Sequence, residues 1–534
     1  MPVSTFGPEI GQVLEELRDP AAYPHPVDKV KAVQTHISCV FLTGCYAYKI
    51  KKPVTFDFLD YSSLDRRRYF CEQELVLNCR LCPDVYIDVV PITLRQGRLQ
   101  VGGAGEPVEW AVRMHQLRAS DMLATRLQDG RVGVSDIERL AGTLAEFHAR
   151  AAADDPVRAF GSLSIVSATI AGTLHVMDQV AIDFLPEEVR RTIRSSLEQF
   201  QRSEAALFQE RQAEDRTRDC HGDLRIQNIC LDARFDAGLQ IFDCIEFNQE
   251  FRFIDVAADL AYLAMDLDLA GRADLRGRLV NHYIKVSGDH GLARILPYYQ
   301  IYRACVRGNI ALLAAAESEI ADAERAAHRE IAAAAYDLAR GYAARRPGPA
   351  LLIMAGFSGS GKSELARQVC RRLPAVLLSS DKVRKELEGL PAIGRLDAEH
   401  YRAKQRAAVY RELRQRAGEM LQHGETVLLD ATFLSDQERE AAAVLAAHHR
   451  AEFWLLECQC SDTEIRRRLK ERRHDAYGSD AGLAVYQDQL RSSVPIALPS
   501  HPHAGIAAHL VVDTDLPVLE AAGHVVDAFL CAGK

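Results

Sequence analysis

The last third of the chain alternates short apolar runs with helical stretches, a pattern typical of a parallel β-sheet covered by helices. A Gly-rich turn and a helix through Leu365–Arg372 follow the first of these runs. The pattern therefore predicts a three-layer α/β domain. Its predicted strands are Ala350–Met354, Ala375–Leu378, Thr426–Leu429, Phe453–Glu457 and Leu510–Val512.

Residues 27–117 show β-type runs arranged around one helix, which we place at Arg66–Cys79. This pattern predicts a small antiparallel sheet with a helix. Residues 1–29 are expected to form a helical extension that precedes it. The predicted strands are Ser38–Leu42, Tyr46–Ile50, Val85–Ile92, Arg98–Val101 and Val108–Met114.

From Ile137 onward apolar residues recur at helical spacing, and helical segments dominate to about residue 344. Two short β-type runs interrupt them, at Asn228–Leu231 and Leu239–Phe242. The segment Arg345–Pro349 contains two prolines and a glycine, so it cannot continue a helix.

We place the main domain boundary in that segment. The first domain is predicted at 30–345, with lobes at about 30–117 and 118–345, and the second at 346–534.

Composition indicates an ordinary globular chain, with 48% hydrophobic and 26% charged residues among 534. The net charge of −9 argues against a generally basic surface, so a nucleic-acid partner is not expected. Thirteen scattered cysteines fit free thiols in a reducing compartment, and Cys79 and Cys82 are expected to be buried rather than to bind zinc. With no secretory signal and no apolar stretch of about 20 residues, we expect a cytoplasmic protein without a membrane partner.

The turn after Ala350–Met354 satisfies G-x-x-x-x-G-K-[ST] between a predicted strand and a predicted helix. In this motif backbone N–H groups turn toward phosphate, Lys362 reaches the β and γ phosphates, and Ser363 ligates Mg²⁺. A nucleotide and its metal are therefore expected here. The binding residues are predicted to be Gly356, Ser358, Gly359, Ser360, Gly361, Lys362 and Ser363.

Further charged residues follow the next predicted strands. Asp381 is a candidate general base and Arg384 a candidate anion ligand, although an N-cap aspartate on a solvated helix is the alternative. Asp430 ends a strand, where a carboxylate can hold Mg²⁺ through its water shell or orient the nucleophile. Arg468 and Arg472 lie one helical turn apart, as charge-neutralising lid residues would, although such a run is also typical of a solvated helix.

Together these motifs resemble the P-loop kinases of the zeta-toxin, gluconate-kinase and polynucleotide-kinase type, which are ATP-binding domains of the AAA kind. The resemblance covers about residues 350–534. It implies the three-layer P-loop NTPase fold and transfer to a small hydroxyl substrate. No motif identifies the acceptor.

A second candidate site begins at His221-Gly222-Asp223 and ends at Asn228, which is the Asp-x-x-x-x-Asn spacing of a kinase catalytic loop. In that loop the aspartate receives the acceptor proton and the asparagine ligates Mg²⁺. Asp243, after a β-type run, is the expected main metal ligand.

At this point the sequence resembles the aminoglycoside phosphotransferase and choline kinase group over about residues 30–345. The resemblance implies a bilobal α+β protein-kinase-like fold. It also implies that Asp255 and Asp259 brace the catalytic loop.

Such a kinase needs a strand lysine for the phosphates and a helix glutamate that holds it. Lys49 and Lys51 share one face of a predicted strand, and we choose Lys49 with Lys51 in reserve. Glu74 is preferred over Glu72 on the next helix. No G-x-G-x-x-G loop precedes Lys49, and only Gly44 marks the turn between the first strands.

The sequence as a whole predicts a bifunctional kinase that uses Mg²⁺ and ATP, with GTP as an alternative, on small-molecule hydroxyl groups. One alternative makes the kinase-like domain a nucleotide sensor without turnover. Another makes the P-loop domain a kinase of nucleic-acid ends or nucleotide sugars. The sequence predicts neither acceptor and no oligomeric state.

Overall fold

The protein is described by a computed structural model for residues 10–56, 58–95, 97–235, 238–317, 321–344, 349–373, 375–388, 403–422, 424–471, 483–492, 494–499 and 507–531. The chain divides into two compact units. One unit comprises Met1–Val166, Ala205–Leu263 and Asn281–Leu292. The other comprises Ser167–Glu204, Ala264–Val280 and Ala293–Lys534, so helices α6, α9, α10 and α11 contribute to both.

The first unit contains a six-stranded antiparallel sheet in the order β1-β2-β3-β8-β6-β7. Helix α2 begins after Ser63, whose side chain caps the Arg66 N–H, and packs against β6 and β8. The predicted antiparallel sheet with one helix is confirmed, and β1 is an addition. The strands are β1 Lys31–Gln34, β2 Ser38–Leu42, β3 Tyr46–Lys51, β6 Tyr86–Arg95, β7 Arg98–Val101 and β8 Glu106–His115, with α2 at Leu64–Asn78 and a β4–β5 hairpin at Thr55–Phe56 and Leu59–Asp60.

The segment before this sheet belongs to its core. Helix α1, Ile10–Glu16, buries Val13, and Leu17 follows it into the same apolar cluster as Phe41 and Ile50. Within the described part of the expected extension over residues 1–29, helix α1 and the 3-10 turn Pro20–Ala22 therefore pack into the apolar cluster of the sheet.

The rest of the first unit is mainly helical, and two short strand pairs hold the polar motifs. The predicted β-type runs around the motifs exist as the pair β10–β11, but each strand is only two residues long. Elements here are α3 Leu123–Gln128, α4 Val134–Arg150, α5 Asp155–Ala159, α6 Leu163–Val180, α8 Ala205–Ala213, β9 Thr217–Asp219, β10 Ile229–Cys230, β11 Gln240–Ile241, β12 Phe253–Asp255, α9 Val256–Leu269 and α10 Ala273–Ser287, with 3-10 turns at Pro20–Ala22, Ala119–Asp121, Ile226–Asn228 and Gln249–Phe251.

The second unit contains a five-stranded parallel sheet in the order β14-β15-β13-β16-β17. All five predicted strands are present, and each side chain of the central strand β13 is buried. The strands are β13 Ala350–Ala355, β14 Ala375–Ser379, β15 Thr426–Asp430, β16 Glu452–Gln459 and β17 Ala507–Asp513, and the helices are α7 Glu187–Ser203, α11 Leu292–Ala315, α12 Asp322–Ala343, α13 Lys362–Cys370, α14 Ser380–Leu387, α15 Ala403–Gln422, α16 Asp436–His448, α17 Asp462–Glu471, α18 Leu483–Ser492 and α19 Val518–Cys531.

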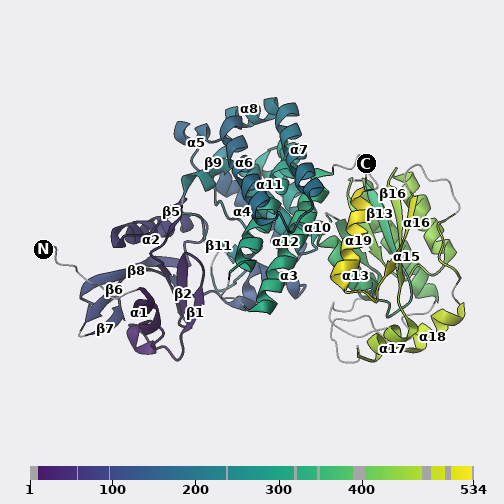
Figure 1. Ribbon diagram of the computed structural model, residues 1–534, viewed down its shortest axis with the longest axis horizontal. Helices are drawn as coiled ribbons and strands as arrows, with labels where there is room; N and C mark the ends of the chain where they lie inside the picture. Colours follow the sequence, from purple (N-terminus) through teal and green to yellow (C-terminus); the bar gives the residue numbers. More distant parts are fainter. Residues whose placement is uncertain are drawn as a thin grey trace. The chain divides into compact units, whose positions relative to one another are not determined.

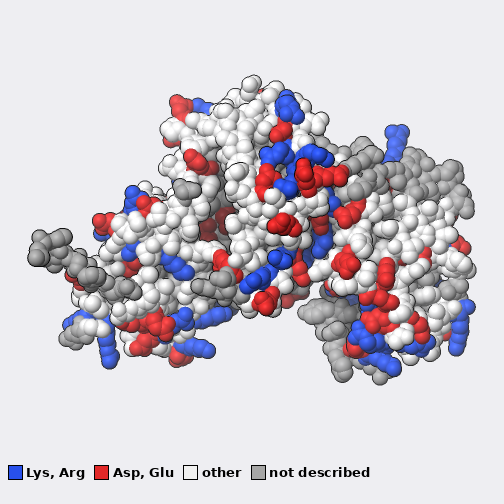
Figure 2. Space-filling view, in the orientation of Figure 1, with Lys and Arg blue, Asp and Glu red and all other residues white. Residues whose placement is uncertain are grey.

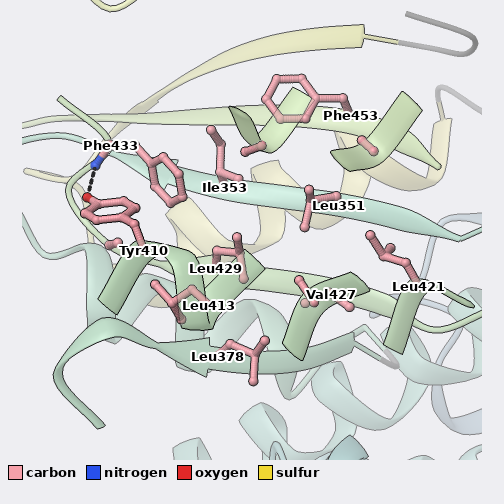
Figure 3. Packing of buried hydrophobic residues seen from close by; sticks show 14 of the residues in the cluster. Leu351, Ile353, Leu378, Tyr410, Leu413, Leu421, Val427, Leu429, Phe433 and Phe453 are labelled. Atoms are coloured by element: carbon pink, nitrogen blue, oxygen red, sulfur yellow. Dashed lines mark hydrogen bonds between the residues drawn. The ribbon is translucent and has the colours of Figure 1, made fainter. Parts of the chain in front are cut away.

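Helices cover both faces of this sheet (Figure 1). Helices α13 and α19 pack on one face, and α15 and α16 on the other. Figure 3 shows the second of these cores, in which Leu351 and Ile353 of β13 meet Leu413 of α15. The Phe433 N–H donates to the Tyr410 hydroxyl at 3.1 Å and joins α15 to the loop after β15. The predicted three-layer fold is confirmed.

Basic and acidic side chains are interspersed on the face drawn in Figure 2. Helix α17 is an example, because Arg466 pairs with Asp462 while Arg467 pairs with Glu464 and Glu471. Within the described parts of the chain, no helix combines the length and the apolar character needed to span a membrane.

Asp337 of α12 is partly buried in the second unit beside two arginines, Arg340 at 3.4 Å and Arg372 at 3.3 Å. Burial raises its pKa to about 6, the charge of Asp527 also raises it, and the arginines oppose the shift. Because the folded-state pKa exceeds the unfolded value of about 4, the folded protein binds more protons between about pH 4 and pH 6. Stability from this group is therefore greatest at low pH and falls as the pH rises through 6.

We expect the melting temperature of Asp337→Asn, relative to the wild type, to rise from about pH 4 to pH 7 and then to level off. Asparagine does not titrate, so the comparison isolates this carboxyl from the other groups. Thermal unfolding of both proteins across the pH range measures it. A difference that is the same at every pH would contradict the shift.

Candidate functional site

The phosphate-binding loop connects the end of β13 to the start of α13, as predicted. Gly356 has φ of +139° and Gly361 has φ of +87°, backbone conformations that side chains rarely adopt. A Cβ on Gly356 would also lie 2.7 Å from the Cys458 carbonyl oxygen. The backbone of the loop therefore requires glycine at both positions, and the closeness of the Cys458 carbonyl adds to this requirement at Gly356.

Lys362 is the first residue of α13 and is buried. Its Nζ donates to the Phe357 carbonyl at 2.5 Å and lies 3.5 Å from the Ser360 hydroxyl. The loop thus wraps around the ammonium group. A bound phosphate would give that ammonium an ionic acceptor in place of a neutral carbonyl.

Ser363 and Asp430 come together at the carboxyl ends of the strands. The Ser363 hydroxyl donates to the Asp430 carboxylate, and Asp430 lies beside Ser379 in the register of β15 and β14. Burial raises the pKa of Asp430, and the charge of Asp381 adds to this, while Ser363 and Lys362 lower it. A hydroxyl and a carboxylate are oxygen donors of the kind that Mg²⁺ takes, so the donor set fits this cation.

Asp381 and Arg384 lie in α14, and Arg384 donates to the Asp381 carboxylate at 2.5 Å. The N-cap of α14 is Ser379, so the alternative of an N-cap aspartate at 381 is wrong. Arg384 is buried, unlike an arginine on a solvated helix. Because the charge of Asp381 acts on Asp430, this pair lies close to Asp430 at the same edge of the sheet.

Of the two predicted lid arginines, Arg468 lies beside the loop and Arg472 lies outside the described residues. Arg468 pairs with Glu464 and donates to the Thr514 carbonyl at 2.7 Å. A Cβ on Gly361 would lie 2.9 Å from its guanidinium. The arginine is thus in contact with the loop, whereas its neighbours pair with acids on the helix surface.

A cavity of about 250 Å³ opens beside Gly361. Its polar and apolar lining comes from three separate segments, and sequence reasoning missed the part contributed by the loop after β17. No motif marks that loop, so only tertiary structure could reveal it. The lining residues are Gly361, Glu364, Leu365, Arg468, Thr514, Leu516, Val518 and Ala521.

The second site is built around the loop after β9, in the first unit. The Asn228 side-chain amide donates to the Asp223 carboxylate and carbonyl, both at 3.0 Å. Gly222 has φ of +86°, and a Cβ there would lie 2.7 Å from the Phe251 carbonyl oxygen. The His-Gly-Asp sequence therefore needs glycine at its centre, both for its backbone conformation and for its closeness to Phe251.

The side chain of Asp259 holds the backbone of this loop, which is the bracing role expected for Asp259. Its carboxylate accepts the N–H groups of His221 at 3.0 Å and Gly222 at 2.9 Å. His148 lies 3.2 Å from the same carboxylate. Burial alone would raise the pKa of Asp259, yet the hydrogen bond and charge of His148 lower it to about 2.

Lys49, Glu74 and Asp243 meet although they are far apart in the sequence. The Lys49 Nζ donates to Glu74 at 2.8 Å and to Asp243 at 2.5 Å. Asp243 has φ of +65°, a rare conformation for a residue with a Cβ and one that concentrates at functional sites. Burial raises the pKa of Asp243, but Lys49 outweighs it and lowers the pKa.

The reserve lysine, Lys51, also reaches Glu74, at 2.8 Å. It is 1% exposed, compared with 13% for the Lys49 side chain, and it pairs with Glu246. Burial alone would raise the pKa of Glu74, but the two lysines lower it. The competing glutamate, Glu72, lies on the surface and pairs with Arg68.

Glu246 and Tyr61 are parts of this network to which sequence reasoning assigned no role. The Tyr61 hydroxyl donates to Glu246 at 2.5 Å, and the Lys51 Nζ lies 3.3 Å from that hydroxyl. Lys51 therefore ties β3 to the segment that follows Asp243.

We expect Lys51→Met to reduce the free energy of unfolding by roughly 3–5 kcal/mol, because it leaves the buried Glu246 carboxylate without its lysine, while Glu74 keeps Lys49. Lys49→Met is the matched control on the same strand with the same partner, and its greater exposure predicts a smaller loss. Denaturant unfolding of the two variants measures the difference. Equal losses of unfolding free energy in the two variants would show that the greater burial of Lys51 does not increase its contribution to stability.

The model of the phosphotransferase enzyme family matches residues 112–298, and that of the AAA domain matches residues 351–496. Together they show a phosphotransferase segment followed by a P-loop kinase segment that binds ATP. Lys49 and Glu74 precede the first match.

Solved structures with low similarity to this chain include two kinases. A choline/ethanolamine kinase family protein from Mesorhizobium loti is 14% identical, with a TM-score of 0.37, covering 62% of this chain and 94% of its own. The APS kinase of Mycobacterium tuberculosis, solved with AMPPNP and APS, is 22% identical, with a TM-score of 0.25, covering 34% and 98%.

Relatives that span most of the chain occur in mycobacteria. Uncharacterized proteins of Mycobacterium tuberculosis and Mycobacterium bovis are each 32% identical over 447 residues, which is 82% of this chain and 86% of theirs. The chain therefore belongs to the family of these mycobacterial proteins, with a phosphotransferase segment followed by a P-loop kinase segment.

Proposed function

We propose that the protein is a bifunctional ATP-dependent kinase, with one phosphoryl-transfer site in residues 30–345 and another in residues 346–534. The observation that carries this proposal is the contact of Lys49 with both Glu74 and Asp243. A kinase is competent only when its strand lysine, helix glutamate and metal aspartate are assembled. Supporting evidence for the second site is the convergence of Ser363 and Asp430 beside Asp381.

In the first site, Asp223 accepts the proton of the acceptor hydroxyl. The hydroxyl oxygen forms a bond to the γ-phosphorus as the bond from that phosphorus to the bridging oxygen of ADP breaks. Lys49 holds the phosphates, and the Asp223 proton then passes to solvent. Asn228 and Asp243 would hold Mg²⁺, whose charge stabilises the transferring group.

In the second site, Asp381 takes the same role as base, and Arg384 holds an anionic part of the acceptor. Lys362 and the loop N–H groups bind the β and γ phosphates. Arg468 neutralises charge on the transferring group. Ser363 and Asp430 would hold Mg²⁺ there, and the cavity beside Gly361 suits the nucleoside of ATP because it adjoins the loop.

An untargeted metabolite screen tests the proposal. The full chain is incubated with Mg²⁺, ATP and a metabolite extract, and mass spectrometry searches for compounds that gain one phosphate. We expect products that require ATP and are absent with heat-denatured protein. ATP consumption without any phosphorylated metabolite would contradict a small-molecule kinase.

A further inference from the structure

The P-loop of this chain has a side-chain partner that nucleotide binding does not explain. The Ser358 N–H donates to the Gln489 side-chain oxygen at 2.9 Å, and the Gln489 amide donates back to the Ser358 hydroxyl at 3.0 Å. Ser358 is 8% exposed. A loop N–H of the kind that binds phosphate is therefore already satisfied by a glutamine oxygen.

Gln489 is held over the loop by the helix that carries it. One turn earlier on α18, Tyr486 is buried and its ring lies 5.7 Å from that of Phe357. The Tyr486 hydroxyl donates to Asp462, the first residue of α17, at 2.8 Å. The position of the amide is thus a consequence of packing rather than of a freely moving side chain.

Helix α17 also packs against the loop and against α18, and so helps to fix the position of Gln489. A Cβ on Gly359 would lie 2.9 Å from Leu469 and 3.0 Å from Ile465. The same residues form an apolar cluster with Tyr486. Both helices therefore pack directly on the loop, and α18 brings a polar group to it.

We propose that the Gln489 amide oxygen occupies the position of a nucleotide phosphate oxygen and must leave Ser358 when nucleotide binds. A charged phosphate oxygen is a stronger acceptor than a neutral amide, so the exchange favours nucleotide. The two hydrogen bonds lost in the exchange reduce the apparent affinity. The inference rests on the proposed binding of nucleotide at the P-loop, and it makes Gln489 a competitor for that site.

The test measures binding of Mg·ATP to the full chain by calorimetry, in a Lys49→Met background that removes the first site. We expect Gln489→Ala to lower the Kd by roughly threefold to tenfold, because one or two hydrogen bonds no longer have to be broken. Gln489→Glu should raise the Kd, since a carboxylate accepts the Ser358 N–H more strongly and repels phosphate.

Gln487→Ala is the matched control, because Gln487 lies on the same helix but is exposed. Its Kd should equal that of the parent protein, and thermal unfolding confirms that every variant is folded. An unchanged or weaker affinity in Gln489→Ala would overturn this inference alone. Absence of Mg·ATP binding in the parent protein would instead overturn nucleotide binding at the P-loop, and with it the inference.

Discussion

Asp223→Asn is expected to lose one of the two phosphorylated products while the other continues to form. Loss of a positioned general base lowers the rate by roughly 10²–10⁴-fold. The substitution keeps the shape of the side chain and an acceptor for the Asn228 amide, which donates to Asp223 at 3.0 Å. Initial rates with each product from the metabolite screen measure the effect.

Asp381→Asn is the reciprocal control, and it should spare the product that Asp223→Asn removes. Loss of both products in either variant would contradict two independent sites. Full activity in Asp223→Asn would leave the kinase-like segment as a nucleotide sensor. If Lys49→Met then loses Mg·ATP binding, the kinase-like segment is identified as a nucleotide sensor.

Lys362→Met is expected to abolish the product formed at the P-loop and to weaken Mg·ATP binding there. The ammonium group is buried at the centre of the loop, where it meets the Phe357 carbonyl at 2.5 Å, and methionine would remove its positive charge from that position. Removing one preorganised charge at a developing anion costs roughly 10²–10³-fold in rate. Initial rates of formation of both products, together with Mg·ATP binding, measure the result.

Lys470→Met provides the control, because Lys470 is an exposed lysine on α17. It should keep both activities at the level of the wild type. A Lys362→Met protein that still forms both products would show that the P-loop contributes no catalysis. Oligonucleotide phosphorylation by the P-loop site, lost in the same variant, would favour the nucleic-acid-end alternative over a small metabolite.

The sequence determined the layers of both units, because local pattern is enough to define them. The continuous apolar runs Ala350–Met354 and Thr426–Leu429 are central parallel strands, buried on both sides, and the structure contains both. The two strands before Asp243 are less clearly marked in the sequence, since β10 and β11 pair over only two residues each. So short a pair carries almost no periodicity.

Motifs whose chemistry depends on close spacing could also be read from the sequence. The P-loop residues share one turn, and Asp223 and Asn228 share one loop, so their juxtaposition follows from local geometry. In contrast, the sequence ranks Lys49 above Lys51 without separating their surroundings, because residues two apart point to the same face of a strand. Only the tertiary structure shows that both lysines reach Glu74 and that Lys51 lies in the interior with Glu246.

Only tertiary structure decided which residues far apart in the sequence meet at the P-loop. Arg466, Arg467 and Arg468 look alike along the chain and each pairs with a nearby acid of α17, yet Arg468 also reaches the Thr514 carbonyl. No local pattern connects Gln489 with Ser358. The sequence thus determined the loop that binds phosphate, and long-range packing of α17, α18 and the β17 loop determined what else lies on it.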